Sequence, residues 1–314
     1  MNISARWAYP AVFVGVLGHG SSEFFAKLSG VAGPETSVWR YLLGGFGLVV
    51  WALLTPGTRD LVTPLRQEPV RIVWLSLLGV TVTYLFFHWA LDYASVIQVA
   101  TVTTTIPIFV ALTNWAVNGV RPGAVKGVTG LLAVLGIVVL LTDGAIEALA
   151  GDGRSVIGVL MAMACAALGS YYAVVIKPVM ARHGGLRVIA LTMFIGGIGL
   201  WLLVGAAWGI WVNPLTLVDK PALAAWSLLV LALWNTTLTQ LMWFGGLSAA
   251  PDITRAAYLF FLKPVLAAAL AIVFLGSWPT VLQVLAIVLV TACVLVELYW
   301  PRVGPRLGAW LGGR

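Results

Sequence analysis

The chain has 314 residues, of which 61% are hydrophobic and 9% are charged, with a formal net charge of +7. Soluble domains carry about 25% charged residues, so this composition excludes a soluble protein and predicts an integral membrane protein. The basic residues are scattered through short connections rather than gathered on one face, which argues against a nucleic-acid partner. Cys165 and Cys293 both fall in apolar stretches and give no disulfide or metal pattern.

Apolar stretches of about 20 residues, the length that a helix needs to cross a bilayer, follow one another along the chain. The predicted spans are 8–28, 36–55, 72–91, 95–117, 123–142, 155–179, 187–211, 223–247, 253–275 and 279–300. These runs are longer than the roughly ten residues of a barrel strand, and in lipid a helical bundle satisfies the backbone. The sequence predicts an all-α integral membrane protein with ten transmembrane helices.

Lysine and arginine are unequally shared between the two sides of this arrangement. With the amino terminus inside, thirteen lie in cytoplasmic segments and four lie toward the outside, namely Lys27, Arg40, Arg154 and Lys220. Basic residues concentrate on the cytoplasmic side of membrane proteins. We therefore expect a multi-pass protein of the plasma membrane, the bacterial inner membrane, with both termini in the cytoplasm. We also expect the first helix to be retained rather than cleaved as a signal peptide.

The two halves of the chain carry the same prolines and glycine in the same order. Corresponding residue numbers differ by 157: Pro107 with Pro264, Gly119 with Gly276, and Pro122 with Pro279. The first proline of each copy lies in an apolar stretch, so both copies are expected to form membrane helices with a proline in the body. Internal repeats in a membrane chain point to transport.

Glycine-rich segments also recur, GGFGL at 44–48 and GGIGL at 196–200. Clustered glycines let helix backbones approach closely, so we interpret both as packing sites. Since five is odd, a second set of five helices must cross the membrane in the opposite direction, which makes the two repeats inverted. The predicted divisions are a first repeat at 1–142, an outer linker at 143–154, a second repeat at 155–300 and a cytoplasmic tail at 301–314.

Five segments carry a family resemblance: VWRYLLGG with Arg40, ALDYAS at 90–95, IPIFVAL around Pro107, GLLAVLGIVVL at 130–140 and LKPVLAAAL around Pro264. In this order and spacing they resemble the EamA-type transporters of the drug/metabolite transporter superfamily. The resemblance implies inverted five-helix repeats and a small polar or amphipathic solute carried through a central cavity. It differs from the usual pattern at Val120, Ser277 and Lys263, positions that are often acidic in the family.

Charged residues inside predicted spans are the first candidates for binding. An ionised lysine as deep as Lys263 costs about 2.5 to 3.5 kcal/mol, so it should face water, a carboxylate or a solute anion; a structural ion pair is the alternative. His19 and Glu23 are four residues apart and share a helix face. They are predicted to bind an ammonium group or relay a proton, unless Glu23 simply neutralises Lys263 or Arg40.

Polar residues on several predicted helices are expected to line a shared hydrated space, because they would be costly facing lipid. The further candidates are Tyr84, His88, Thr101, Thr105, Tyr171 and Asn235. For each hydroxyl, a bond to its own helix is the simpler alternative. Pro107 and Pro264 are predicted hinges, with a static kink as the alternative.

The leading hypothesis is a secondary transporter that exports amino acids or related small zwitterionic metabolites by alternating access. Lys263 would bind the carboxylate and Glu23 the ammonium group. Efflux of hydrophobic or cationic drugs is the alternative. The sequence offers no catalytic cluster, metal-ligand set or phosphate loop, so we expect no enzyme and no cofactor. The expected partners are the solute and the lipid bilayer, with protons as a candidate coupling ion; substrate identity, direction, coupling and oligomeric state stay open.

Overall fold

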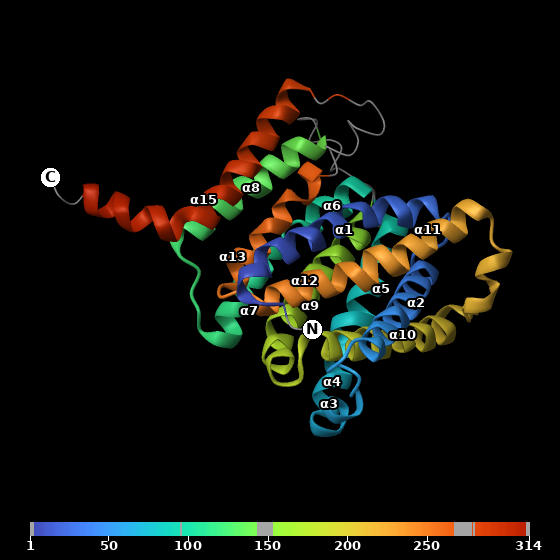
Figure 1. Ribbon diagram of the computed structural model, residues 1–314. Coiled ribbons are helices and arrows are strands. Elements are labelled where there is room, and N and C mark those ends of the chain that lie inside the picture. Colours follow the sequence, from blue (N-terminus) through green and yellow to red (C-terminus); the bar gives the residue numbers. More distant parts are fainter. Residues whose placement is uncertain (1–2, 95, 143–152, 267–277, 279, 312–314) are drawn as a thin grey trace.

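The computed structural model describes most of the chain, and all regular secondary structure in the described residues is helical (Figure 1). The description leaves out residues 1–2, 95, 143–152, 267–277, 279 and 312–314. Most of the predicted linker, Gly276, Pro279 and the end of the predicted tail therefore lie outside the described residues. The predicted all-α class is confirmed.

The described elements follow the chain in two series. After the short 3-10 turn η1 (Ala5–Trp7), the first series is α1 (Ala8–Leu28), α2 (Gly33–Leu54), α3 (Val62–Gln67), α4 (Pro69–Ser76), the π-helical η2 (Leu77–Val82), α5 (Thr83–Tyr93), α6 (Val96–Thr103), α7 (Ile106–Asn118) and α8 (Ala124–Thr142). The second is α9 (Gly153–His183), α10 (Gly185–Trp208), the 3-10 η4 (Pro214–Asp219), α11 (Ala222–Ala232), the π-helical η5 (Leu233–Leu238), α12 (Thr239–Ala249), α13 (Ile253–Ala257), the 3-10 η6 (Tyr258–Leu262) and α15 (Val281–Leu311).

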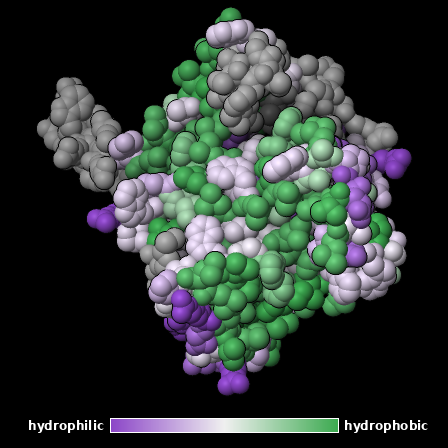
Figure 2. All heavy atoms as spheres, turned by 45° about the vertical axis from the view of Figure 1, so that its right-hand side comes forward, coloured by the Kyte–Doolittle hydropathy of each residue, from purple (hydrophilic) through white to green (hydrophobic). Residues whose placement is uncertain are grey.

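Seven helices among the described residues are long and apolar enough to cross a membrane. They are Gly33–Leu54, Pro69–Tyr93, Gln98–Asn118, Arg154–His183, Gly185–Trp208, Ala222–Ala249 and Val281–Trp300. Of the other predicted spans, α1 coincides with 8–28 and α8 falls within 123–142, whereas 253–275 is described only to residue 266. The chain is a multi-pass membrane protein, and Figure 2 shows hydrophobic residues covering much of one face.

Two long helices widen in the middle at corresponding places, η2 and η5. A threonine reaches back five residues in each: Thr83 Oγ1 donates to the Leu78 carbonyl at 2.8 Å, and Thr239 Oγ1 to the Trp234 carbonyl at 2.7 Å. A carbonyl displaced by a wide turn needs such a donor. These threonines therefore stabilise the same local distortion in both halves.

Both repeated prolines follow an interruption in their helix. A turn at residues 104–105 separates α6 from α7, and Pro107 occupies the first turn of α7. In the second half η6 precedes Pro264, which belongs to the helical residues 263–266. The sequence predicted prolines in the middle of helices, whereas the structure places both near the start of a helical segment. A proline in a first turn sacrifices no intrahelical hydrogen bond.

The glycine-rich segments pack the two halves against each other. Thr237 Oγ1 donates to the Gly44 carbonyl at 2.9 Å, and Thr81 Oγ1 donates to the Gly196 carbonyl at 2.8 Å. A Cβ at Gly197 would lie 2.5 Å from the Tyr41 carbonyl oxygen. The prediction that these glycines permit close packing is therefore confirmed.

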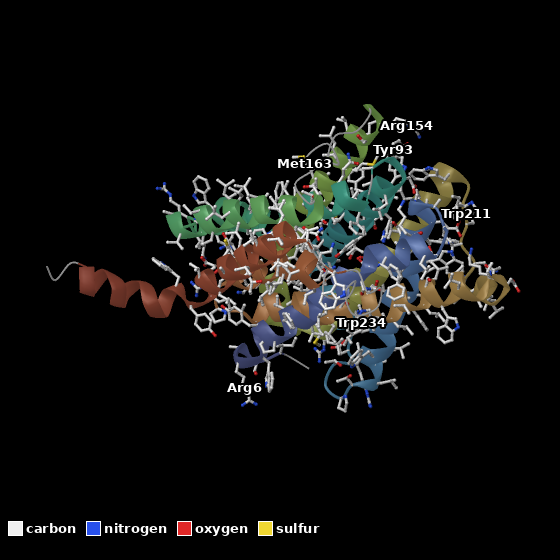
Figure 3. All side chains as sticks on the ribbon, turned by 90° about the horizontal axis from the view of Figure 1, so that it is seen from above. Arg6, Tyr93, Arg154, Met163, Trp211 and Trp234 are labelled. Atoms are coloured by element: carbon white, nitrogen blue, oxygen red, sulfur yellow. The ribbon has the colours of Figure 1, made fainter. Side chains whose placement is uncertain are left out.

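Helix pairs that bring the two halves together recur across the bundle. α1 packs along α12, α5 along α9, and α2 along α10. At one end of the α5–α9 pair, the Arg154 guanidinium lies 5.7 Å from the centre of the Tyr93 ring (Figure 3). α8 and α15 form a further pair beside the others (Figure 1). The central helices contributed by both halves leave a cavity between them.

Candidate functional site

A cavity of about 50 Å³ lies among helices from both halves of the chain. Its polar lining includes His19, Arg40, Tyr84 and Lys263, and its aromatic lining includes Phe87, Trp243, Phe244 and Phe260. A water molecule needs about 10–15 Å³ of such space, whereas ligand pockets are usually about 300–1,000 Å³. In this conformation the cavity therefore has room for a few water molecules and is smaller than a usual ligand pocket.

Lys263 sits where η6 gives way to the following helical turn. Its side chain is buried, and Nζ lies 5.6 Å from the centre of the Phe260 ring and 5.9 Å from that of Phe87. Aromatic faces attract cations. The structure thus places the ammonium group at the cavity between aromatic residues from the two halves.

His19 also lines the cavity, from α1. Its ring packs edge-on against Trp243 and Phe260, with centroids 5.5 and 5.4 Å apart. Within the described part of the chain, the buried Nε2 atom has no hydrogen-bond partner. His19 Nε2 is therefore a buried polar atom to which the described residues supply no hydrogen bond.

Arg40 extends from α2 to the cavity and is 1% exposed. Its Nε donates to Thr236 Oγ1 at 3.0 Å and its Nη2 donates to the Asn235 carbonyl at 2.8 Å. Its Nη1 lies 3.3 Å from His88 Nε2. None of the carboxylates described in this structure forms an ion pair with Arg40.

His88 is fully buried behind Arg40 and is not part of the cavity lining. A guanidinium offers only donors, so His88 Nε2 must accept from Arg40. Nδ1 then carries the proton and lies 3.0 Å from the Tyr84 carbonyl and 2.8 Å from Ser37 Oγ. The contacts describe a neutral histidine that orients Arg40, rather than a residue that meets the cavity.

Tyr84 does line the cavity and stacks on Tyr41, with ring centroids 4.2 Å apart. Gln240 Nε2 donates to both hydroxyls, at 3.1 Å for Tyr41 and 2.9 Å for Tyr84. Asn235 is buried away from the cavity, where its amide donates to the Gly18 carbonyl. Asn235 therefore joins η5 to α1.

The other predicted site residues are not part of the described cavity lining. The Thr105 hydroxyl donates to the Val102 carbonyl, three residues earlier, at 2.6 Å. Neither Thr101 nor Tyr171 belongs to the described cavity lining. The side chain of Glu23 lies outside the described residues, although its backbone belongs to α1. Pro107 and Pro264 are near the cavity in sequence, beside the lining residues Ile106 and Lys263.

Sequence reasoning omitted Arg40 and most of the aromatic lining from the predicted site. Phe87 and Trp243 occupy positions that differ by 156, the spacing that also relates Thr83 to Thr239. The repeat spacing was the signal that could have brought Phe87 and Trp243 together as facing residues.

Two lysines bind helix ends on opposite sides of the predicted topology. Near the end of α1, Lys27 Nζ donates to the Leu91 carbonyl in the last turn of α5 at 2.8 Å. Lys177 in α9 donates to the Ala250 carbonyl, which follows α12, at 2.7 Å. Cations at helix carboxyl ends are favourable. The two contacts therefore join α1 to α5 and α9 to the end of α12, which are corresponding helix pairs of the two halves.

An ion-pair network joins α8, α13 and α15 beside the Lys177 contact. Lys126 Nζ lies 2.6 Å from Asp252 Oδ2, and Arg255 approaches both Asp252 and Glu297 within 3.6 Å. Burial raises the pKa of the Asp252 carboxyl, but the hydrogen bonds from Lys126 and from the Arg255 amide outweigh burial and hold that pKa below its usual range. The network therefore favours an ionised Asp252.

Comparisons with known proteins identify relatives of this chain. A model of the EamA-like transporter family matches residues 6–142 and 156–298. An uncharacterized transporter of Archaeoglobus fulgidus is 24% identical over 241 residues, covering 77% of this chain and 79% of the relative. The uncharacterized transporter YvbV of Bacillus subtilis strain 168 is 26% identical over 265 residues, covering 82% and 80%.

The fold has a counterpart among solved structures. One crystal structure, described only as that of a protein, matches with a TM-score of 0.79 over 96% of this chain and 99% of its own, at 21% identity. At that identity the likeness concerns the fold alone.

Proposed function

The chain belongs to the EamA-like transporter family, and on that premise we propose that it exports amino acids or related small zwitterionic metabolites through the central cavity. The observation that carries the proposal is the pairing of buried Lys263 with the apolar and aromatic cavity wall. The cation suits a carboxylate, and the wall suits an apolar side chain. Glu23 is the proposed partner of the ammonium group.

We propose ten transmembrane helices arranged as two inverted five-helix repeats. The family match falls on each half of the chain in turn. The reciprocal bonds of Thr237 with Gly44 and of Thr81 with Gly196 support the same relationship, since each half supplies both a glycine helix and a threonine helix. Inverted halves can exchange conformations and so expose one site to either side.

The lysine contacts at the two helix ends fit an alternating cycle. With both termini in the cytoplasm of a bacterial inner membrane, Lys27 closes the outer side and Lys177 the inner side. Both contacts are formed in this structure, and the cavity is small. The proposed cycle breaks one contact at a time, with the helix interruptions before Pro107 and Pro264 as hinges.

Flux through proteoliposomes tests the substrate proposal. Purified protein is reconstituted with a mixture of labelled amino acids inside, with and without a pH gradient, and release is measured. We expect release by the wild type, loss in Lys263→Ala, and normal release in Lys220→Ala, which removes the same charge from a loop. Equal release by the wild type and Lys263→Ala would overturn the role of Lys263.

Efflux of hydrophobic drugs is the second candidate, favoured by the aromatic lining of Phe87, Trp243 and Phe260. A lipophilic cation would be repelled by Lys263. Drug tolerance of expressing cells separates the candidates: protection that persists or grows in Lys263→Ala would favour drug efflux.

A further inference from the structure

The described residues that pack around Arg40 do not balance its charge. Its side chain is 1% exposed and lines the cavity, and its described partners are a threonine hydroxyl, a main-chain carbonyl and a histidine ring. All three are neutral. Buried charges are normally paired with an opposite charge, because desolvation is costly. Among the described residues, that opposite charge is not supplied.

The donors of Arg40 are only partly used. A guanidinium carries five N–H donors, and the contacts to Thr236, the Asn235 carbonyl and His88 employ one donor from each of its three nitrogens. The contacts hold the planar group in one orientation and leave donor capacity on both terminal nitrogens. A fixed guanidinium of this kind binds a carboxylate well, because both groups are planar.

The repeat shows that the helix packing itself does not need this charge. The spacing that relates Gly44 to Gly196 relates Arg40 to Thr192. Thr192 is equally buried, and its hydroxyl lies 2.6 Å from the Tyr172 hydroxyl. At the corresponding position of α10, the second half of the chain therefore has a small neutral residue where α2 has Arg40.

Lys263 shows the opposite asymmetry, because its counterpart in the first half is the cavity-lining Ile106. Each half thus contributes one cation to a cavity of about 50 Å³. The two cations do not occupy corresponding positions of the repeat. An anion in this space would interact with both halves at once.

We propose that Arg40, held by His88, binds the carboxylate of the transported solute together with Lys263, so that the carboxylate is the required recognition group. This inference rests on the proposed transport function and specifies its substrate class as carboxylates with an apolar side chain. The carboxylate would then contact cations from both halves of the chain.

Three matched probes separate the carboxylate from the amine: leucine, 4-methylpentanoate, which lacks the amine, and 3-methylbutylamine, which lacks the carboxylate. Thermal unfolding of the purified full chain in detergent is followed against each probe at constant ionic strength. We expect stabilisation by leucine and 4-methylpentanoate and none by the amine. Stabilisation by the amine alone, or by none of the three, would overturn the proposal.

Variants then assign the effect to Arg40. Arg40→Gln is expected to weaken the apparent affinity for 4-methylpentanoate about tenfold or more, with Arg40→Lys intermediate and Lys220→Gln unchanged. Unchanged affinity in Arg40→Gln would refute the assignment. If Arg40→Gln fails to fold, Arg40→Lys and the wild-type probe comparison still decide, because Arg40→Lys should bind more weakly than the wild type.

The inference and the proposed function can fail separately. Stabilisation by 4-methylpentanoate without leucine flux would reject amino-acid export and keep the carboxylate site. Leucine flux that Arg40→Gln leaves intact would keep export and reject the role of Arg40.

Discussion

Thr237 donates its hydroxyl proton to the main-chain carbonyl of Gly44 across a distance of 2.9 Å. The bond joins the second half of the chain to the first, at a point where the helices are too close for a larger residue. A Cβ at Gly44 would lie 2.6 Å from Thr236 Cβ and 2.7 Å from the Ala232 carbonyl oxygen. This contact determines how closely α2 and the η5 region can approach.

Gly44→Ala is therefore expected to destabilise the protein by about 1–3 kcal/mol, the usual cost of overpacking. Thermal unfolding in detergent measures the effect. Gly123→Ala is the matched control, because a Cβ there would have no neighbour within 4 Å. Equal stability of the two variants would show that the helices separate at little cost.

His88→Phe should weaken binding of 4-methylpentanoate, because Arg40 loses the ring nitrogen that orients it. The pH dependence of transport should stay the same as in the wild type, since a ring that accepts from a guanidinium is already neutral. Flux measured between about pH 6 and 8, where histidines ordinarily titrate, provides the readout. A pH profile that flattens in the variant would instead identify His88 as a proton carrier.

Asp252→Asn should lower the unfolding temperature at neutral pH by removing the Lys126 contact. The pKa of Asp252 is depressed in the folded state, so its contribution is present above the unfolded pKa and is lost as the pH falls through the folded one. The difference between wild type and variant should therefore be fully present above roughly pH 4 and shrink as the pH falls below that value.

Asp219→Asn is the control for that measurement, because Asp219 is exposed at the end of η4. It should leave the unfolding temperature unchanged across the same range. A difference for Asp252→Asn that persists in strong acid would mean that the ionised carboxyl is not what stabilises the network.

Long apolar runs made the helical class and the membrane location predictable, because lipid leaves the backbone few alternatives. The repeated glycines were visible too and were predicted to be packing sites, whereas the threonines that donate to the Gly44 and Gly196 carbonyls were not predicted as their partners. The local geometry around Pro107 was harder to predict from the sequence, since a proline in an apolar run is compatible with a kinked helix as well as with a new helix start.

The candidate site was predictable only in part. Lys263 stood out because a charge in the middle of a span is expensive, and His19 because it shares its helix face with Glu23. Spacing alone could not separate His88, which lies behind Arg40, from Tyr84, which meets the cavity four residues earlier. That distinction depends on how α5 is rotated against α2, which a helical period does not specify.

Access to Cys165 tests the alternating-access account most directly. Cys165 lines the cavity and is buried, and in a Cys293→Ser background it is a native reporter for membrane-impermeant thiol reagents. The account predicts slow labelling from either side of oriented vesicles, faster labelling from outside in Lys27→Met and faster labelling from inside in Lys177→Met. Labelling that comes from one side only and is unchanged by both variants would contradict it.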